Sequence, residues 1–194
     1  HLLHTSPMYN KPPQRGIVAH FRAIADAVDL PLIVYNVPGR TGSNVEAATT
    51  LELAGHENIT AVKEASGNLP QIAEIVRNRP AHFTVLSGDD ALTLAVMAEG
   101  GDGVISVTSN VVPRLAAKQV ECCDDADIAG ARDIAKRLSA WTTAAFVESN
   151  PIPAKAALAM MGRIENVLRP PLVPMLASHE EGLRKALRVA GAVA

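Results

Sequence analysis

The stretch Ile59-Thr60-Ala61-Val62-Lys63 is a short apolar run that ends abruptly in a lysine. Runs of this length, rich in Val, Ile and Leu and apolar on both faces, are typical of strands that are buried on both sides of a sheet. Four further segments have the same character, namely residues 2–6, 30–36, 83–88 and 103–107. We therefore expect five short strands in the first part of the chain.

Helical periodicity occupies the gaps between these runs. Residues 16–28 place apolar side chains three and four positions apart, and residues 47–53, 69–76 and 91–99 do the same. Alternating strands and helices of this size predict parallel strands joined by right-handed crossovers. After Pro113 only helical patterns follow. The expected domains are an α/β part at 1–120 and an all-helical part at 121–194.

Composition excludes several classes of function. The chain of 194 residues carries 18 basic and 20 acidic residues, so the excess of positive charge that nucleic-acid binding needs is absent. No run approaches the roughly 18 apolar residues that span a bilayer. The histidines are scattered, which disfavours a zinc site. Cys122 and Cys123 are expected to be free thiols in a reducing cytoplasm.

Lys63 is the first candidate for chemistry, because active sites of (β/α) barrels lie at the carboxyl ends of the strands. An amine at the end of an apolar strand is partly desolvated, which lowers its pKa and frees its lone pair for attack on a carbonyl. Such an amine can form a Schiff base. The alternative is an ordinary lysine whose ammonium group reaches out to water.

Tyr35 and Arg40 support the chemical interpretation of Lys63. Tyr35 ends the preceding strand, where its hydroxyl could relay protons near the amine. Arg40 lies in Asn36-Val37-Pro38-Gly39-Arg40-Thr41-Gly42, which we expect to be a tight loop presenting a carboxylate clamp. An interfacial tyrosine and a solvated arginine remain the alternatives.

Four motifs, in their order along the chain, resemble dihydrodipicolinate synthase, also called 4-hydroxy-tetrahydrodipicolinate synthase. They are Tyr-Asn-Val-Pro-Gly-Arg-Thr-Gly at 35–42, Val-Lys-Glu-Ala-Ser-Gly at 62–67, Leu-Ser-Gly-Asp-Asp at 86–90 and Gly-Asp-Gly-Val-Ile-Ser-Val-Thr at 101–108. Segments 7–12 and 146–155 fit the same family. The resemblance implies a TIM (β/α)8 barrel, represented here by about its last five βα units, with a C-terminal all-helical domain.

The resemblance also implies a reaction and a set of roles. Pyruvate and aspartate-semialdehyde would condense through a lysine Schiff base in the diaminopimelate route of lysine biosynthesis, without metal or organic cofactor, in a dimer of dimers. Three positions match catalytic residues: Lys63 for the Schiff base, Tyr35 for proton relay, and Tyr9 for a tyrosine that crosses the dimer interface. Three more match substrate-binding positions, namely Arg40, Gly88 and Ile105.

The sequence departs from the family pattern at two points. The family's catalytic threonine lies in a Gly-Thr-Thr-Gly-Glu type motif that does not occur here, and the pairs at 49–50 and 142–143 lie in helical patterns. Met8 stands where many members have a tyrosine lining the lysine feedback site. The alternatives are a sister pyruvate aldolase (N-acetylneuraminate lyase or a keto-deoxy sugar acid aldolase) and a truncated, non-catalytic relative. Since such barrels run to about 250 residues, we expect a portion of a longer chain lacking about three strands.

Overall fold

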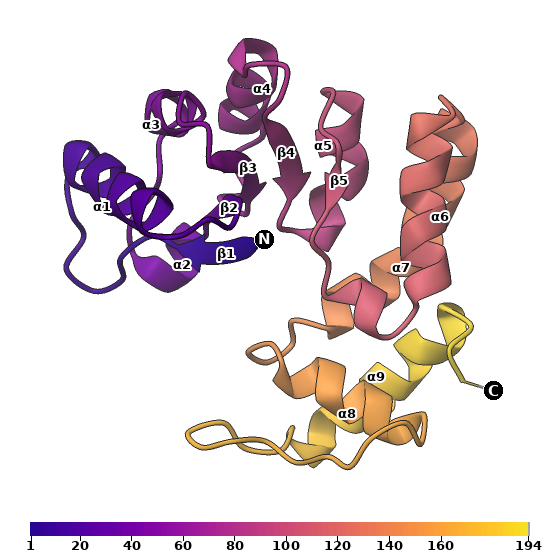
Figure 1. Ribbon diagram of the computed structural model, residues 1–194. Helices are drawn as coiled ribbons and strands as arrows, with labels where there is room; N and C mark the ends of the chain where they lie inside the picture. The colour runs from indigo at the N-terminus through magenta and orange to yellow at the C-terminus, as the bar shows by residue number, and fades with distance from the viewer. Residues whose placement is uncertain (194) are drawn as a thin grey trace. The chain divides into compact units, whose positions relative to one another are not determined.

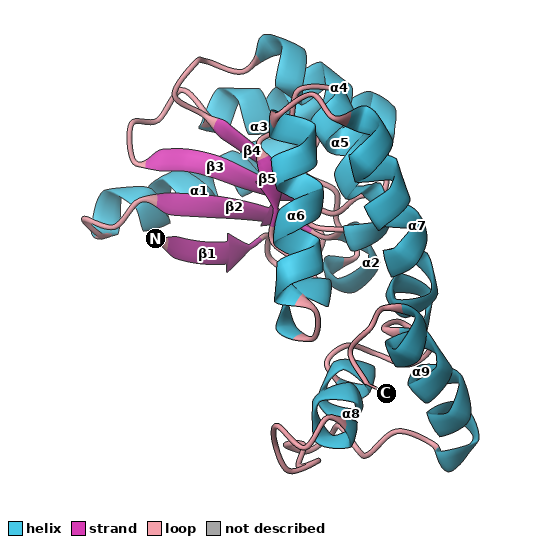
Figure 2. Ribbon diagram, turned by 90° about the vertical axis from the view of Figure 1, so that its right-hand side faces the viewer, coloured by secondary structure: helices cyan, strands magenta, loops and turns pink. Residues whose placement is uncertain are grey.

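A computed structural model describes residues 1–193, and these contain one sheet of five parallel strands arranged in chain order. The strands are β1 (Leu2–Thr5), β2 (Leu32–Asn36), β3 (Ile59–Glu64), β4 (Thr84–Ser87) and β5 (Gly103–Val104). Figure 2 shows the first four lying side by side. The prediction of five parallel strands is confirmed. The last strand is shorter than residues 103–107, because the backbone is already helical at Val107, ahead of a 3-10 turn.

Helices connect the strands, and the longer ones pack against one face of the sheet (Figure 1). They are α1 (Gln14–Ala27), α2 (Pro38–Thr41), α3 (Ala47–Leu53), α4 (Leu69–Asn78), the 3-10 turn η1 (Asp90–Leu92) and α5 (Thr93–Ala98). The single-turn helix α2 was not expected, since its sequence was interpreted as a loop. Pro38 fits the first turn of a helix, where no backbone N–H is required, and Gly42 ends the turn with a φ of +74°.

The core of this part lies between the sheet and the helices. Leu32 and Val34 of β2 and Val62 of β3 are fully buried there, together with Ile17 and Phe21 of α1. Because successive side chains of a strand point to opposite faces, Tyr35 and Lys63 project from the other face of the sheet. That face is only partly covered. The strand pattern therefore separates an apolar, helix-covered side from a side that can hold a reactive amine.

The pairing of β2 with β3 contains a shift of one residue near its start. Leu32 pairs with Ile59, whereas Ile33 pairs with Ala61, so Thr60 has no partner on β2. From there the register is regular and brings Tyr35 opposite Lys63. The shift lies near the amino ends of the strands, away from the lysine.

The helical part forms a second compact unit that begins at Ser106, whereas the first unit ends at Ile105. It contains η2 (Thr108–Asn110), α6 (Pro113–Asp124), α7 (Ile128–Ala144), α8 (Ile152–Met160) and α9 (Ala177–Val189). Trp141 and Leu187 are fully buried within it. The expected domain boundary at residue 120 would fall inside α6 and stays a prediction. Among the described residues, no helix is both long and apolar enough to cross a membrane.

Candidate active site

Lys63 and Tyr35 are brought together at the carboxyl ends of β3 and β2. They are direct partners in the parallel register, and the Lys63 Nζ lies 4.1 Å from the centroid of the Tyr35 ring. Both side chains are half-buried. An amine at this distance from an aromatic face is held by the ring's negative quadrupole when it is protonated. The structure thus places the two residues next to each other, as the strand order predicted.

Burial lowers the pKa of the Lys63 amine below its usual range, because the charged form loses hydration. The carboxylate of Asp90 opposes this effect, while the guanidinium of Arg40 lowers the pKa further. Burial raises the pKa of the Tyr35 hydroxyl, and Arg40 partly counteracts that change. Both shifts act toward the neutral form of each group, and a neutral amine beside a protonated phenol is the combination that nucleophilic attack with proton relay requires.

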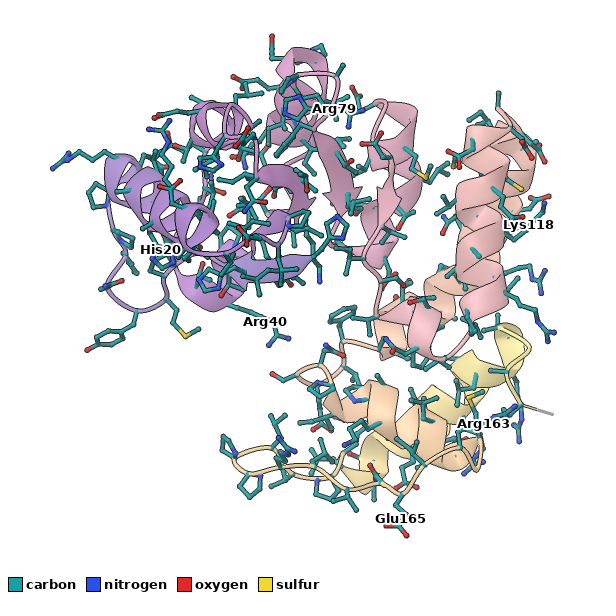
Figure 3. All side chains as sticks on the ribbon, in the orientation of Figure 1. His20, Arg40, Arg79, Lys118, Arg163 and Glu165 are labelled. Atoms are coloured by element: carbon teal, nitrogen blue, oxygen red, sulfur yellow. The ribbon has the colours of Figure 1, made fainter. Side chains whose placement is uncertain are left out.

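Arg40 lies on α2, directly after β2, and projects from that helix in Figure 3. Its position corrects the expectation of a loop, although the turn remains tight. The charge of Arg40 reaches both Lys63 and Tyr35, since it affects the pKa of each. A guanidinium held on a short, proline-started helix can present its planar donors to a carboxylate in a fixed direction.

Gly88 lies against the stem of Lys63, just after β4. A Cβ added at this position would lie 3.1 Å from Lys63 Cγ and 2.7 Å from Ala65 Cβ. The backbone N–H of Gly88 also donates to the Glu64 carbonyl at 2.7 Å. Glycine is therefore required here by close approach. Ile105 follows β5, and its N–H donates to the Ser87 carbonyl at 2.9 Å.

Tyr9 is not brought to Lys63 within this chain. It lies in the segment after β1, has a φ of +72° and is 95% exposed. Its backbone N–H donates to the Thr41 carbonyl at 3.3 Å, which ties the segment to α2. A role across a dimer interface remains a prediction for this residue.

The sequence interpretation missed the roles of three polar residues near the lysine. Asp89 caps the 3-10 turn η1, because its side chain accepts from the Ala91 N–H, whereas the neighbouring Asp90 is 9% exposed and its charge acts on Lys63. Glu64 and Asn36 were noted only as neighbours of Lys63 and Tyr35. Strand alternation could have revealed them, because it places both on the buried face, where polar side chains need partners.

Across residues 1–193, no group of three or more His, Cys, Asp or Glu side chains is arranged to hold a metal ion. Cys122 and Cys123 are free thiols, in agreement with their adjacency in the sequence. The Thr49–Thr50 and Thr142–Thr143 pairs lie within α3 and α7, as their sequence patterns predicted.

The fold and this site together define a (β/α)-barrel type protein with a desolvated lysine at a strand end. The model of the dihydrodipicolinate synthetase family matches residues 1–190. The chain is 53% identical over 190 residues to a 4-hydroxy-tetrahydrodipicolinate synthase of Koribacter versatilis, covering 98% of this chain and 63% of that protein. It is 48% identical over 193 residues to the synthase of Prosthecochloris aestuarii, of which it covers 65%.

Solved structures agree with these sequence matches. The dihydrodipicolinate synthase of Thermotoga maritima superposes with a TM-score of 0.96 at 41% identity, over 98% of this chain and 66% of that one. The chain thus belongs to the dihydrodipicolinate synthetase family and spans about two thirds of the length of the relatives it matches. The expected fold class, a portion of a TIM barrel followed by C-terminal helices, is confirmed.

Proposed function

We propose that this chain carries the lysine centre of a 4-hydroxy-tetrahydrodipicolinate synthase, which condenses pyruvate with aspartate-semialdehyde. One observation carries the proposal most directly: the half-buried Lys63 amine, with its lowered pKa, lies 4.1 Å from the ring centroid of Tyr35 at the carboxyl end of the sheet. The names of the relatives support the same reaction.

Lys63 is the proposed nucleophile of the first step. Its neutral amine attacks the keto carbon of pyruvate, a carbon–nitrogen bond forms, and loss of water gives a protonated imine. The imine is an electron sink, so the methyl group of pyruvate can lose a proton and become a nucleophilic enamine. Burial lowers the pKa of Lys63 and so increases the share of neutral amine at a given pH, which favours the nucleophilic form.

Tyr35 and Arg40 complete the proposed chemistry. The phenol of Tyr35, whose pKa is raised by burial, stays protonated and can pass protons to the departing water and from the carbinolamine. The Arg40 guanidinium would receive the carboxylate of aspartate-semialdehyde and orient its aldehyde toward the enamine. Gly88 and Ile105 would line the pyruvate site through their backbones.

Assembly and location form part of the same proposal. The exposed Tyr9 would reach across a dimer interface into the site of a second copy of the chain, within a dimer of dimers in the cytoplasm. The names of the relatives favour the synthase over N-acetylneuraminate lyase and keto-deoxy sugar acid aldolases.

The test of this function is trapping of the imine. The protein is incubated with pyruvate, reduced with borohydride and analysed by peptide mass spectrometry, with Lys63→Ala as the matched control. We expect a pyruvate adduct on Lys63 and none in the variant. Absence of the adduct from the unmodified chain would refute the imine. An adduct without turnover of aspartate-semialdehyde would favour a sister aldolase or the truncated, non-catalytic relative.

A further inference from the structure

A network of buried polar side chains lies on the helix-facing side of the sheet, directly behind the proposed site. At its centre is the carboxylate of Glu64, which is 1% exposed. Asn36, 0% exposed, donates its Nδ2–H to Glu64 Oε2 at 2.9 Å. Gln71 of α4 donates to the same oxygen at 3.2 Å, and the Ser66 N–H donates to Oε1 at 2.7 Å. Three donors from three segments therefore converge on one carboxylate.

The network extends beyond the carboxylate to the segment that precedes α3. Asn36 donates to the Val45 carbonyl at 3.2 Å and accepts from the Val45 N–H at 2.9 Å. Asn44 donates to Gln71 Oε1 at 2.8 Å. The network thus ties β2, β3, α4 and the chain before α3 into one unit at the carboxyl end of the sheet.

We infer that the Glu64–Asn36–Gln71 network is a positioning unit that fixes Lys63 and Tyr35 relative to each other. Glu64 follows Lys63 in β3 and Asn36 follows Tyr35 in β2, and these two pairs are aligned in the register. The side-chain bond between Asn36 and Glu64 therefore locks the two strand ends from behind, while the reactive pair projects in front. This inference rests on the proposed function, since it assigns a role toward the proposed lysine nucleophile.

The hydrogen-bond donors of the network explain why a glutamate, and not a glutamine, stands at position 64. All of the groups bonded to Glu64 in the network are donors, so an acceptor-only carboxylate satisfies every one of them. Glu64→Gln would turn at least one amide N–H toward another donor. A buried mismatch of this kind forces the strand ends apart or rotates the side chains, and small misplacements at a reacting group strongly reduce rates.

The first readout measures geometry without substrate. The Lys63 amine lies over the Tyr35 ring, so the Hε protons of Lys63 should show an upfield ring-current shift in the NMR spectrum of lysine-labelled protein. Tyr35→Leu assigns this signal by abolishing the shift. We expect Glu64→Gln and the milder Gln71→Ala to reduce the shift. The control Val62→Ala removes buried apolar contacts from the same face of β3 and should preserve it.

The second readout is the rate at which the pyruvate imine forms on the protein, measured by borohydride trapping and corrected for the folded fraction. Glu64→Gln should slow adduct formation roughly tenfold or more, whereas Val62→Ala should stay within about twofold of the unmodified chain. Unchanged shifts and rates in both network variants would overturn the inference. A missing adduct in the unmodified chain would instead refute the proposed function, and the ring-current shift would still decide on positioning. If Glu64→Gln does not fold, Gln71→Ala carries both measurements.

Discussion

Gly88→Ala is the perturbation whose effect the structure defines most closely. The new Cβ would lie 2.7 Å from Ala65 Cβ and 3.1 Å from Lys63 Cγ. Ordinary carbon–carbon contacts are about 3.5–4.0 Å, so the first separation must grow by about 1 Å and the second by about 0.5 Å. The backbone cannot retreat freely, because the Gly88 N–H donates to the Glu64 carbonyl at 2.7 Å. The strain therefore falls on Ala65 and on the stem of Lys63.

Two magnitudes follow from this geometry. Overpacking of a well-filled site costs about 1–3 kcal/mol in the free energy of unfolding, measured by urea titration with circular dichroism. Displacement of the nucleophile by a fraction of an ångström should slow borohydride-trapped adduct formation by about 10- to 100-fold. The double variant Gly88→Ala/Ala65→Gly relieves the closest contact only. It should recover stability while much of the rate loss remains, since the contact with Lys63 Cγ persists.

Gly182→Ala is the matched control, because its added Cβ has no atom within 4 Å and the position lies in α9, outside the site. It should stabilise the chain by about 0.4–1 kcal/mol and leave the adduct rate unchanged. A Gly88→Ala variant with the stability and trapping rate of the unmodified chain would refute the close-approach reasoning.

Lys63→Met should raise stability at neutral pH, because burial lowers the folded-state pKa of Lys63 and its charge is therefore unfavourable in the folded state. Between the lowered pKa of Lys63 and the ordinary value near 10.5, the unfolded state binds more protons than the folded state, so the stability of the unmodified chain should rise with pH across that window. Its deficit in stability relative to Lys63→Met should therefore shrink in paired urea titrations. A deficit that stays constant with pH would contradict the desolvation argument. Thr50→Val should stabilise by about 1 kcal/mol, since Thr50 Oγ1 is buried without a hydrogen-bond partner among the described residues. Thr49→Val should instead cost about 1 kcal/mol, because Thr49 Oγ1 donates to Gln14 at 2.7 Å. Urea titrations of the two variants measure both changes, and equal effects at both positions would contradict this assignment.

The strands were predictable because a buried parallel sheet imposes a simple rule on the sequence. Residues 59–64 show it well: the apolar run identifies β3, and its end identifies Lys63 as a residue of the site. Arg40 was predicted to lie on a tight loop directly after β2, and it lies there on the single-turn helix α2 instead. Pro38 and Gly42 are compatible with both a tight loop and a single helical turn, and only the surrounding packing distinguishes them.

Other features depend on contacts that are remote in the sequence. Asn36, Glu64 and Gln71 meet because three separate segments converge, and no local pattern indicates which polar side chains will pair. The charge of Asp90 likewise acts on Lys63 from the segment after β4. These groups become meaningful only when the register of the strands is known.

The one-residue shift between β2 and β3 has a consequence for transplanting or redesigning this site. A ladder continued without the shift from Leu32 and Ile59 would set Tyr35 beside Val62 and Asn36 beside Lys63. The phenol and the amine would then belong to unmatched positions, and the carboxylate behind them would lose its amide partner. The unpaired Thr60 thus acts as a spacer that sets the register of the carboxyl ends of β2 and β3, several residues away. A grafted sheet that copies the residues of the site but removes the shift near the amino ends of β2 and β3 would carry the right side chains in the wrong register.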